Sequence, residues 1–107
     1  MEGYKPQDFS FLTAVRISTT MNKFQNDLMR YSKLSGAFEY AAKRVLADKN
    51  NTLLRQEMQA AYNQLENVGY KAIETIYKDN PGESDAESIY EIARIDIAYM
   101  RIIFQNI

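Results

Sequence analysis

The residue in this sequence with the clearest potential for chemistry is Asp96, an acid in an apolar setting. On a helical projection it falls near the middle of an apolar face, between Ile92 and Met100. A carboxylate buried there needs a partner, because an unpaired buried charge is strongly unfavourable. We expect Tyr31, Tyr62 or a basic residue of an earlier helix to supply it. A structural role in fixing the register of the helices is the preferred interpretation of Asp96, and a functional carboxylate is the alternative.

The side chains on which most enzymes rely are missing. The 107 residues include no His and no Cys, which excludes disulfides, Cys-ligated metals, and His-based or Cys-based nucleophilic catalysis. The glycines stand singly at Gly3, Gly36, Gly69 and Gly82, so the chain has no Gly-rich phosphate loop. Carboxylates are scattered over polar helix flanks rather than paired for a metal. We therefore expect no enzymatic activity, no metal and no cofactor.

Basic side chains mark the polar face of the first predicted helix, at Arg16, Lys23, Arg30 and Lys33. At this spacing they could follow the phosphates of a nucleic acid, with salt-dependent affinity. Aromatic residues do not interleave them, however, and the net charge of −1 differs from the basic balance typical of such domains. A solvated face is the preferred interpretation, and a nucleic-acid-binding module is an alternative function.

Two apolar or aromatic groups are candidates for contact with a protein partner. Ile95 and Ile102 lie beyond one edge of the apolar face of the last predicted helix, with Tyr99 between them. Tyr70 and Tyr77, seven residues apart, are expected to project together from the polar side of the middle helix. Such side chains are typical anchors of protein interfaces. For the two tyrosines, packing against the first helix or the turn near Pro81 is the preferred interpretation, and a contact surface is the alternative.

Helices position these residues, because apolar residues recur every three or four positions and glycine and proline are scarce. The first helix is predicted over about residues 8–48 from a stripe that includes Ala14, Ile17, Met21, Phe24, Leu28 and Tyr31. A break at Gly36 would divide this helix in two. We favour a continuous helix, because the same spacing of apolar residues continues beyond this glycine. A polar turn follows, with Asn51 or Thr52 as the next helix cap.

The second helix is predicted to extend to about residue 77 or 78. Its stripe consists of Leu54, Met58, Ala61, Leu65, Val68 and Ala72, and is widened by Tyr62, Ile73 and Ile76. Gly69 within it indicates close approach of a neighbouring helix, and Pro81 ends the helix. The run from Ser84 to Glu87 has the pattern of a capping box and predicts a last helix over about residues 85–105.

The predicted helix lengths bear on oligomeric state. An unbroken first helix would be about 60 Å long, whereas the second and third would reach only about 39 and 32 Å. Part of the apolar stripe would then stay uncovered, and a second copy of the chain would cover it most simply.

Together these features predict an all-α fold, an antiparallel bundle of three long helices (four with the break) in one domain over residues 1–107, completed by dimerisation. The expected function is non-catalytic protein binding, of the adaptor, chaperone, inhibitor or immunity type. A structural homo-oligomer subunit is a further alternative. The start of the chain has no apolar signal region and no stretch approaches the ~20 apolar residues of a membrane span, so we expect a cytoplasmic protein.

Overall fold

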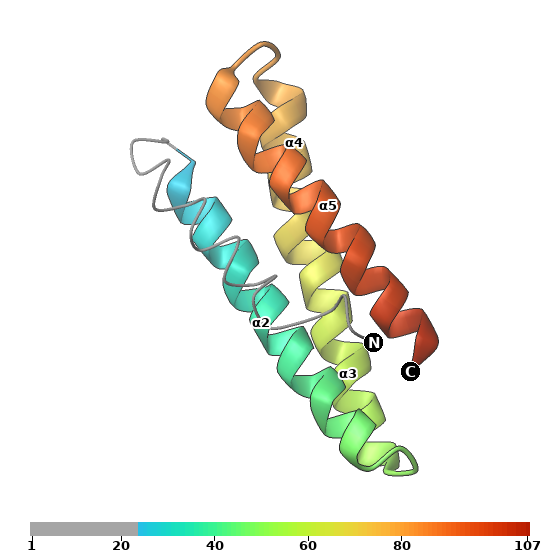
Figure 1. Cartoon of the computed structure of the whole chain (residues 1–107). Coiled ribbons are helices and arrows are strands. Elements are labelled where there is room, and N and C mark those ends of the chain that lie inside the picture. Colours follow the sequence, from blue (N-terminus) through green and yellow to red (C-terminus); the bar gives the residue numbers. More distant parts are fainter. Residues whose placement is uncertain (1–23) are drawn as a thin grey trace.

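The computed structural model describes residues 24–107, which form three long helical rods (Figure 1). The first is α2 (Gln25–Ala47). The second is built from three consecutive pieces, α3 (Thr52–Gln64), the π-helical turn η1 (Leu65–Tyr70) and α4 (Lys71–Asp79). The third is α5 (Ser84–Asn106). α2 and α5 point in the same direction and the middle rod runs antiparallel to both (Figure 1). The described part is thus all-α, as the sequence predicts.

α2 is continuous through Gly36, which confirms that this glycine does not break the helix. The helix starts at Gln25, however, so the predicted start of this helix near Asp8 is wrong. Phe24 precedes it with φ −101° and ψ 19°, in the bridge region rather than the α-helical region. No side chain caps this end of the helix, and no Gly or Pro lies beside it. The regular spacing of apolar residues therefore gave no sign that a helix begins at Gln25. The rest of the predicted stripe, residues 8–23, lies outside the described residues.

The observed lengths remove the mismatch from which dimerisation was inferred. α2 and α5 each contain 23 residues, or about 35 Å of helix. The middle rod covers Thr52–Asp79 and is longer than either by more than one turn, and none of the described helices approaches the predicted length of about 60 Å (Figure 1). Dimerisation therefore stays a prediction without the support of helix length.

The middle rod begins where the sequence predicts. Asn51 is its N-cap, and the Asn51 side chain accepts a hydrogen bond of 3.1 Å from the Leu54 N–H. At its other end, Asn80 Nδ2 donates to the Ile76 carbonyl oxygen at 2.8 Å. Gly82 then reverses the chain with φ 80°, a conformation that favours glycine.

η1 is a feature that the periodicity did not predict. The Lys71 N–H donates to the carbonyl oxygen of Glu66, five residues back, which makes this turn wider than an α-helical one. Every later side chain is therefore rotated relative to the predicted stripe. Val68, predicted to face the core, is 43% exposed, whereas Gly69 and Tyr70 are buried.

Gly69 confirms the predicted close approach of two helices. A Cβ atom on this residue would lie 3.1 Å from Leu34 Cδ1 and 3.2 Å from Tyr31 Cδ1, closer than ordinary packing distances. The small residue thus lets η1 lie directly against α2.

The prediction of a capping box at the start of α5 is wrong, because no side chain caps this end of the helix. Glu83, not Ser84, is the N-cap, and its carbonyl oxygen accepts from the Glu87 N–H at 3.0 Å. Ser84 is already inside the first turn. The tight turn at Gly82 leaves Glu83 extended, with φ −76° and ψ 115°, and so starts the helix earlier than the box requires.

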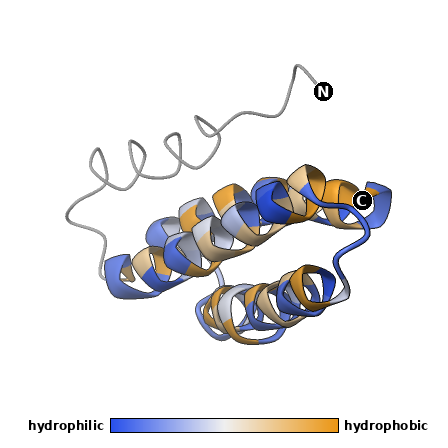
Figure 2. Cartoon of the chain, turned by 90° about the horizontal axis from the view of Figure 1, so that it is seen from below, coloured by the Kyte–Doolittle hydropathy of each residue, from blue (hydrophilic) through white to orange (hydrophobic). Residues whose placement is uncertain are grey.

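The core lies between the three rods. Each helix carries both hydrophobic and hydrophilic residues along its length (Figure 2). An aromatic cluster ties the rods together. Tyr62 stacks on Phe104 with ring centroids 4.3 Å apart, and Phe38 meets both rings edge-on. Several large apolar side chains stay outside this core: Met29, Tyr40, Leu46, Leu53, Val68, Tyr77, Ile95 and Ile102.

Candidate protein-binding surface

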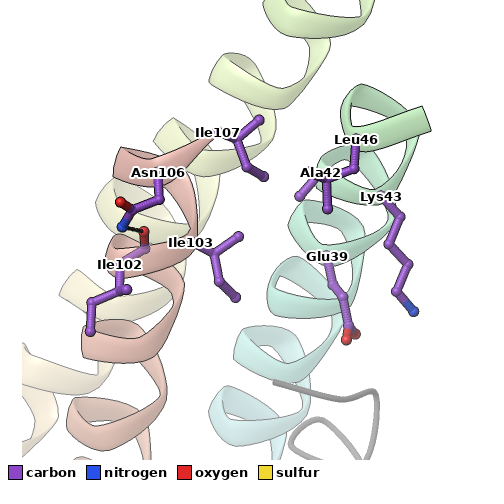
Figure 3. A pocket seen from close by; sticks show the side chains of 8 residues that line it. All are labelled: Glu39, Ala42, Lys43, Leu46, Ile102, Ile103, Asn106 and Ile107. Atoms are coloured by element: carbon purple, nitrogen blue, oxygen red, sulfur yellow. Dashed lines mark hydrogen bonds between the residues drawn. The ribbon is translucent and has the colours of Figure 1, made fainter. Parts of the chain in front are cut away.

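An apolar groove of about 370 Å³ lies between the C-terminal halves of α2 and α5. Ile103 of α5 and Ile107, directly after the end of α5, point across it toward Ala42 and Leu46 of α2 (Figure 3). Its complete lining is Glu39, Ala42, Lys43, Leu46, Ile102, Ile103, Asn106 and Ile107, hereafter the α2–α5 groove.

The groove exists because both helices pack mainly on the middle rod rather than on each other. α2 makes its most extensive contact with α3. The end of α5 is held to the same rod, by the stack of Phe104 on Tyr62 and by an ion pair between Arg101 and Glu66. The side of α5 that faces α2 is consequently left open along its last turns.

Exposed apolar side chains extend the groove along α5. Ile95 is 57% exposed and Ile102 is 51% exposed, and Tyr99 lies half-buried between them. Leu46 on α2 is 52% exposed at the opposite rim. The prediction that Ile95 and Ile102 project beyond the core is thus confirmed. We call Ile95, Tyr99 and Ile102 the α5 edge, and its role in binding stays a prediction.

Tyr70 and Tyr77 do not project together from the polar side, so the predicted joint projection is wrong, and both rings pack against Tyr90 of the neighbouring helix α5. Tyr70 is buried, with its ring centroid 6.2 Å from that of Tyr90, and burial raises the pKa of Tyr70. Tyr77 is 37% exposed and stacks on Tyr90, with the two ring centroids 4.1 Å apart. The extra residue of η1 rotates Tyr70 inward from the polar flank on which an unbroken α-helix would place it.

Asp96 is buried and paired, as the sequence predicts. Its Oδ2 accepts hydrogen bonds of 2.9 Å from the Tyr31 hydroxyl and from Ser35 Oγ, both on α2. Burial and the Asp96 carboxylate raise the pKa of Tyr31. Tyr62, the other predicted partner, donates instead to Glu66. Ser35 was missed, although it lies one helical turn from Tyr31 on the same face.

A second polar cluster, which sequence reasoning missed, fastens α5 to the middle rod. Arg101 Nη2 lies 2.6 Å from Glu66 Oε2, and the Tyr62 hydroxyl donates to Glu66 Oε1 at 2.6 Å. The hydrogen bond from Arg101 lowers the pKa of Glu66, while burial, followed by the bond to Glu66, raises the pKa of Tyr62 to about 12. Nothing local in the sequence marks this pairing, because its members lie on three different turns of two rods.

The predicted basic face is only partly described. Arg30 and Lys33 are exposed on α2, and Arg30 Nη1 lies 3.8 Å from Asp27 Oδ1. Arg16 and Lys23 lie outside the described residues. Nucleic-acid binding through this face stays a prediction.

The α2–α5 groove is suited to hydrocarbon side chains, since six of its eight lining residues are apolar or contribute long aliphatic stems.

Between residues 24 and 107 no three acidic side chains are placed to hold a metal ion. None of the described helices has the length and hydropathy needed to cross a bilayer. Comparisons with protein-family models, characterised proteins and solved structures gave no match to this chain.

Proposed function

We propose that this chain is a non-catalytic interaction protein that binds an amphipathic helix of another protein along the α2–α5 groove and the α5 edge. The observation that carries the proposal is the groove itself, an apolar channel between two helices with Ile102 and Leu46 half-exposed at its rims. Adaptor, chaperone, inhibitor and immunity proteins all act by contacts of this kind, and the identity of the partner would decide among them.

A helix is the occupant that fits this shape. Two helices pointing the same way over a shared third rod leave a channel that a further helix fills, as in four-helix bundles. Amphipathic helices bind such grooves through apolar side chains spaced by three or four residues.

The energetics favour binding at this face. Complete burial of an isoleucine or leucine is worth about 1.5–3 kcal/mol. Ile95, Ile102 and Leu46 are each about half-exposed, so a partner would remove the remaining apolar area from water. Lys43, exposed at the rim of the groove, would attract an acidic side chain of the partner helix.

Site-specific photo-crosslinking in the producing cells tests the proposal. A benzophenone amino acid at position 102 is expected to link the chain to a distinct partner. The same amino acid at Gln56, on the exposed outer face of α3, is expected to give no such product. An added Ile95→Asp substitution should abolish the product.

Identical products from both positions, or none from position 102, would contradict the proposal. A product that contains only a second copy of the chain would instead support the structural homo-oligomer alternative.

A further inference from the structure

We propose that the outer face of α2 binds single-stranded nucleic acid, with basic side chains on the phosphates and the ring of Tyr40 stacked on a base. This face carries Arg30, Lys33, Ala37, Tyr40 and Arg44, hereafter the α2 stripe. It is a second binding site of the chain. Its activity does not depend on the binding of a protein in the α2–α5 groove.

The α2 stripe exists because α2 is continuous through Gly36. Its members follow one another at alternating intervals of three and four residues, so they lie on one side of the helix. The basic face predicted from the sequence ends at Lys33 and contains no aromatic residue. The unbroken helix adds Tyr40 and Arg44 to it, over a length of about 21 Å from Arg30. An aromatic ring among cations is the arrangement that single strands require.

Tyr40 provides the surface for stacking. Among the described residues it is the most exposed large hydrophobic side chain, at 65%. Arg44 Cζ lies 5.7 Å from the centroid of the Tyr40 ring, in cation–π contact. Because much of the ring remains in water, a nucleobase can stack on it. The neighbouring guanidinium is then placed to contact the adjoining phosphate.

Two carboxylates lie beside the α2 stripe, and neither blocks it. Arg30 Nη1 is 3.8 Å from Asp27 Oδ1, and Arg44 Nη1 is 2.9 Å from Glu57 Oε1. Both pairs lie at the surface, where ion pairs contribute little, so a phosphate can take up the same guanidinium groups. Among residues 24–107 no carboxylate pairs with Lys33, whose ammonium group is exposed.

The residue types of the α2 stripe favour a nucleic acid over a protein as its ligand. Lysine and alanine are depleted from protein interfaces, whereas Lys33 and Ala37 occupy the middle of the stripe. Exposed cations are what the phosphates of a strand need. The apolar anchors Ile95 and Ile102 lie on another helix, α5.

An NMR titration of the isotope-labelled full-length chain with an oligothymidylate of about 12 nucleotides tests the proposal. At low salt, amide signals from Arg30 to Arg44 should shift in a saturable way, and those of Ile95 and Ile102 should not. A rise from about 50 to about 200 mM salt should weaken binding about tenfold, because phosphate contacts release counterions. Absence of shifts at low salt, or equal shifts along the α5 edge, would overturn the proposal.

Two variants that each lose one positive charge give a matched comparison. Lys33→Gln should weaken binding several-fold and reduce the slope of log affinity against log salt by about 0.7. Arg94→Gln should change neither. Arg94 lies on the side of α5 away from α2, since Asp96, two residues further on, contacts α2. Equal weakening in both variants would mean that the charge of the whole protein, and not the α2 stripe, attracts the strand.

Substitution of Tyr40 tests the stacking. Tyr40→Ala removes the ring and should weaken binding about fivefold or more, whereas Tyr40→Phe keeps the ring and should bind as the wild type does. Neither change reaches the core, because the side chain is largely exposed, and circular dichroism checks that the helices are retained. Equal affinity of the two variants would overturn the stacking role.

A DNA duplex of the same length and polyglutamate of the same charge identify the class of ligand. Neither presents an unstacked base, so Tyr40→Ala should leave their affinities unchanged. A loss for the duplex as large as that for the oligothymidylate would overturn the assignment to single strands. Polyglutamate binding as tight as the oligothymidylate would overturn the nucleic acid in favour of an acidic protein.

The Ile95→Asp variant separates this site from the proposed function. It should bind the oligothymidylate as the wild type does, even though it should lose the partner crosslink. Loss of both would show that one surface serves both ligands, and would overturn the assignment to the α2 stripe.

Discussion

At the scale of single residues, Asp96 joins α5 to α2 through two hydroxyl donors that meet at one carboxylate oxygen. This arrangement is typical of a residue that fixes helix register, because both donors depend on the relative position of the two helices. The cluster is packed into the core rather than open to a cavity, as its burial shows.

Substitution of Asp96 separates hydrogen bonding from side-chain volume. Asp96→Asn keeps an acceptor for Tyr31 and Ser35 and should retain the fold, at a cost of about 1–2 kcal/mol. Asp96→Leu leaves both buried hydroxyls without this acceptor and should cost about 3 kcal/mol or more. Urea unfolding of the two variants gives the comparison. A greater loss for Asn than for Leu would argue against the hydrogen-bonding role.

Glu66 provides a pH test at the same scale. Its folded-state pKa lies below the ordinary value of 4.5, so the contribution of the Arg101 pair is present above that pH and is lost as pH falls through the lowered pKa. The side chains of Arg101 and Glu66 are 41% and 25% exposed, so solvent screening keeps this contribution below about 1 kcal/mol. Unfolding free energies measured between pH 3 and pH 7 should therefore fall less steeply in Glu66→Gln than in the wild type. Parallel curves would show that the pair does not carry the acid dependence.

At the scale of helices, the contact between η1 and α2 depends on Gly69. In Gly69→Ala, the added methyl group would require Leu34 and Tyr31 to shift, because it would lie 3.1 and 3.2 Å from their side chains. We expect a net loss of about 1–3 kcal/mol from overpacking, although alanine favours helix formation. Asn67→Ala, exposed in the same turn, is the control and should change stability little. Equal thermal stability of the two variants would contradict a close contact.

The sequence predicts the helices better than it predicts their relative rotation. Apolar spacing located the middle rod, its Asn51 cap and the small residue at Gly69, because these depend on local propensity and on faces that must be buried. It could not reveal η1, since one extra residue in a turn leaves no compositional mark. The extra residue in η1 turns Tyr70 toward the core. For this reason Tyr70 and Tyr77 do not project together from the polar side, as the spacing had predicted.

The candidate site was predicted in part for the same reason. Ile95 and Ile102 lie on α5, where no irregular turn intervenes, so their projection from the core followed directly from helical spacing. The opposite wall of the groove on α2 was missed, because its existence depends on how far α2 and α5 separate over the middle rod. The pairing of Arg101 with Glu66 was missed likewise, since it depends on the rotation of two rods.

At the scale of the whole molecule, binding and stability should respond to different residues. Ile102→Asp alters a half-exposed side chain outside the core and should change the unfolding free energy by no more than about 0.5–1 kcal/mol. The same substitution should abolish the partner crosslink placed at position 95. Thermal unfolding and crosslinking of one preparation would show both effects. Comparable losses of fold and crosslink would mean that Ile102 serves the core rather than a binding surface.

The most direct test of the central claim, that the space between α2 and α5 accepts an amphipathic helix, is an NMR titration of the full-length chain with a synthetic helical peptide that carries leucine at every third or fourth position and acidic side chains on its opposite face. The account predicts saturable shifts of amide signals from Glu39 to Leu46 and from Ile95 to Ile107. Absence of shifts, or shifts on the outer face of α3 around Gln56 and Asn63, would contradict it.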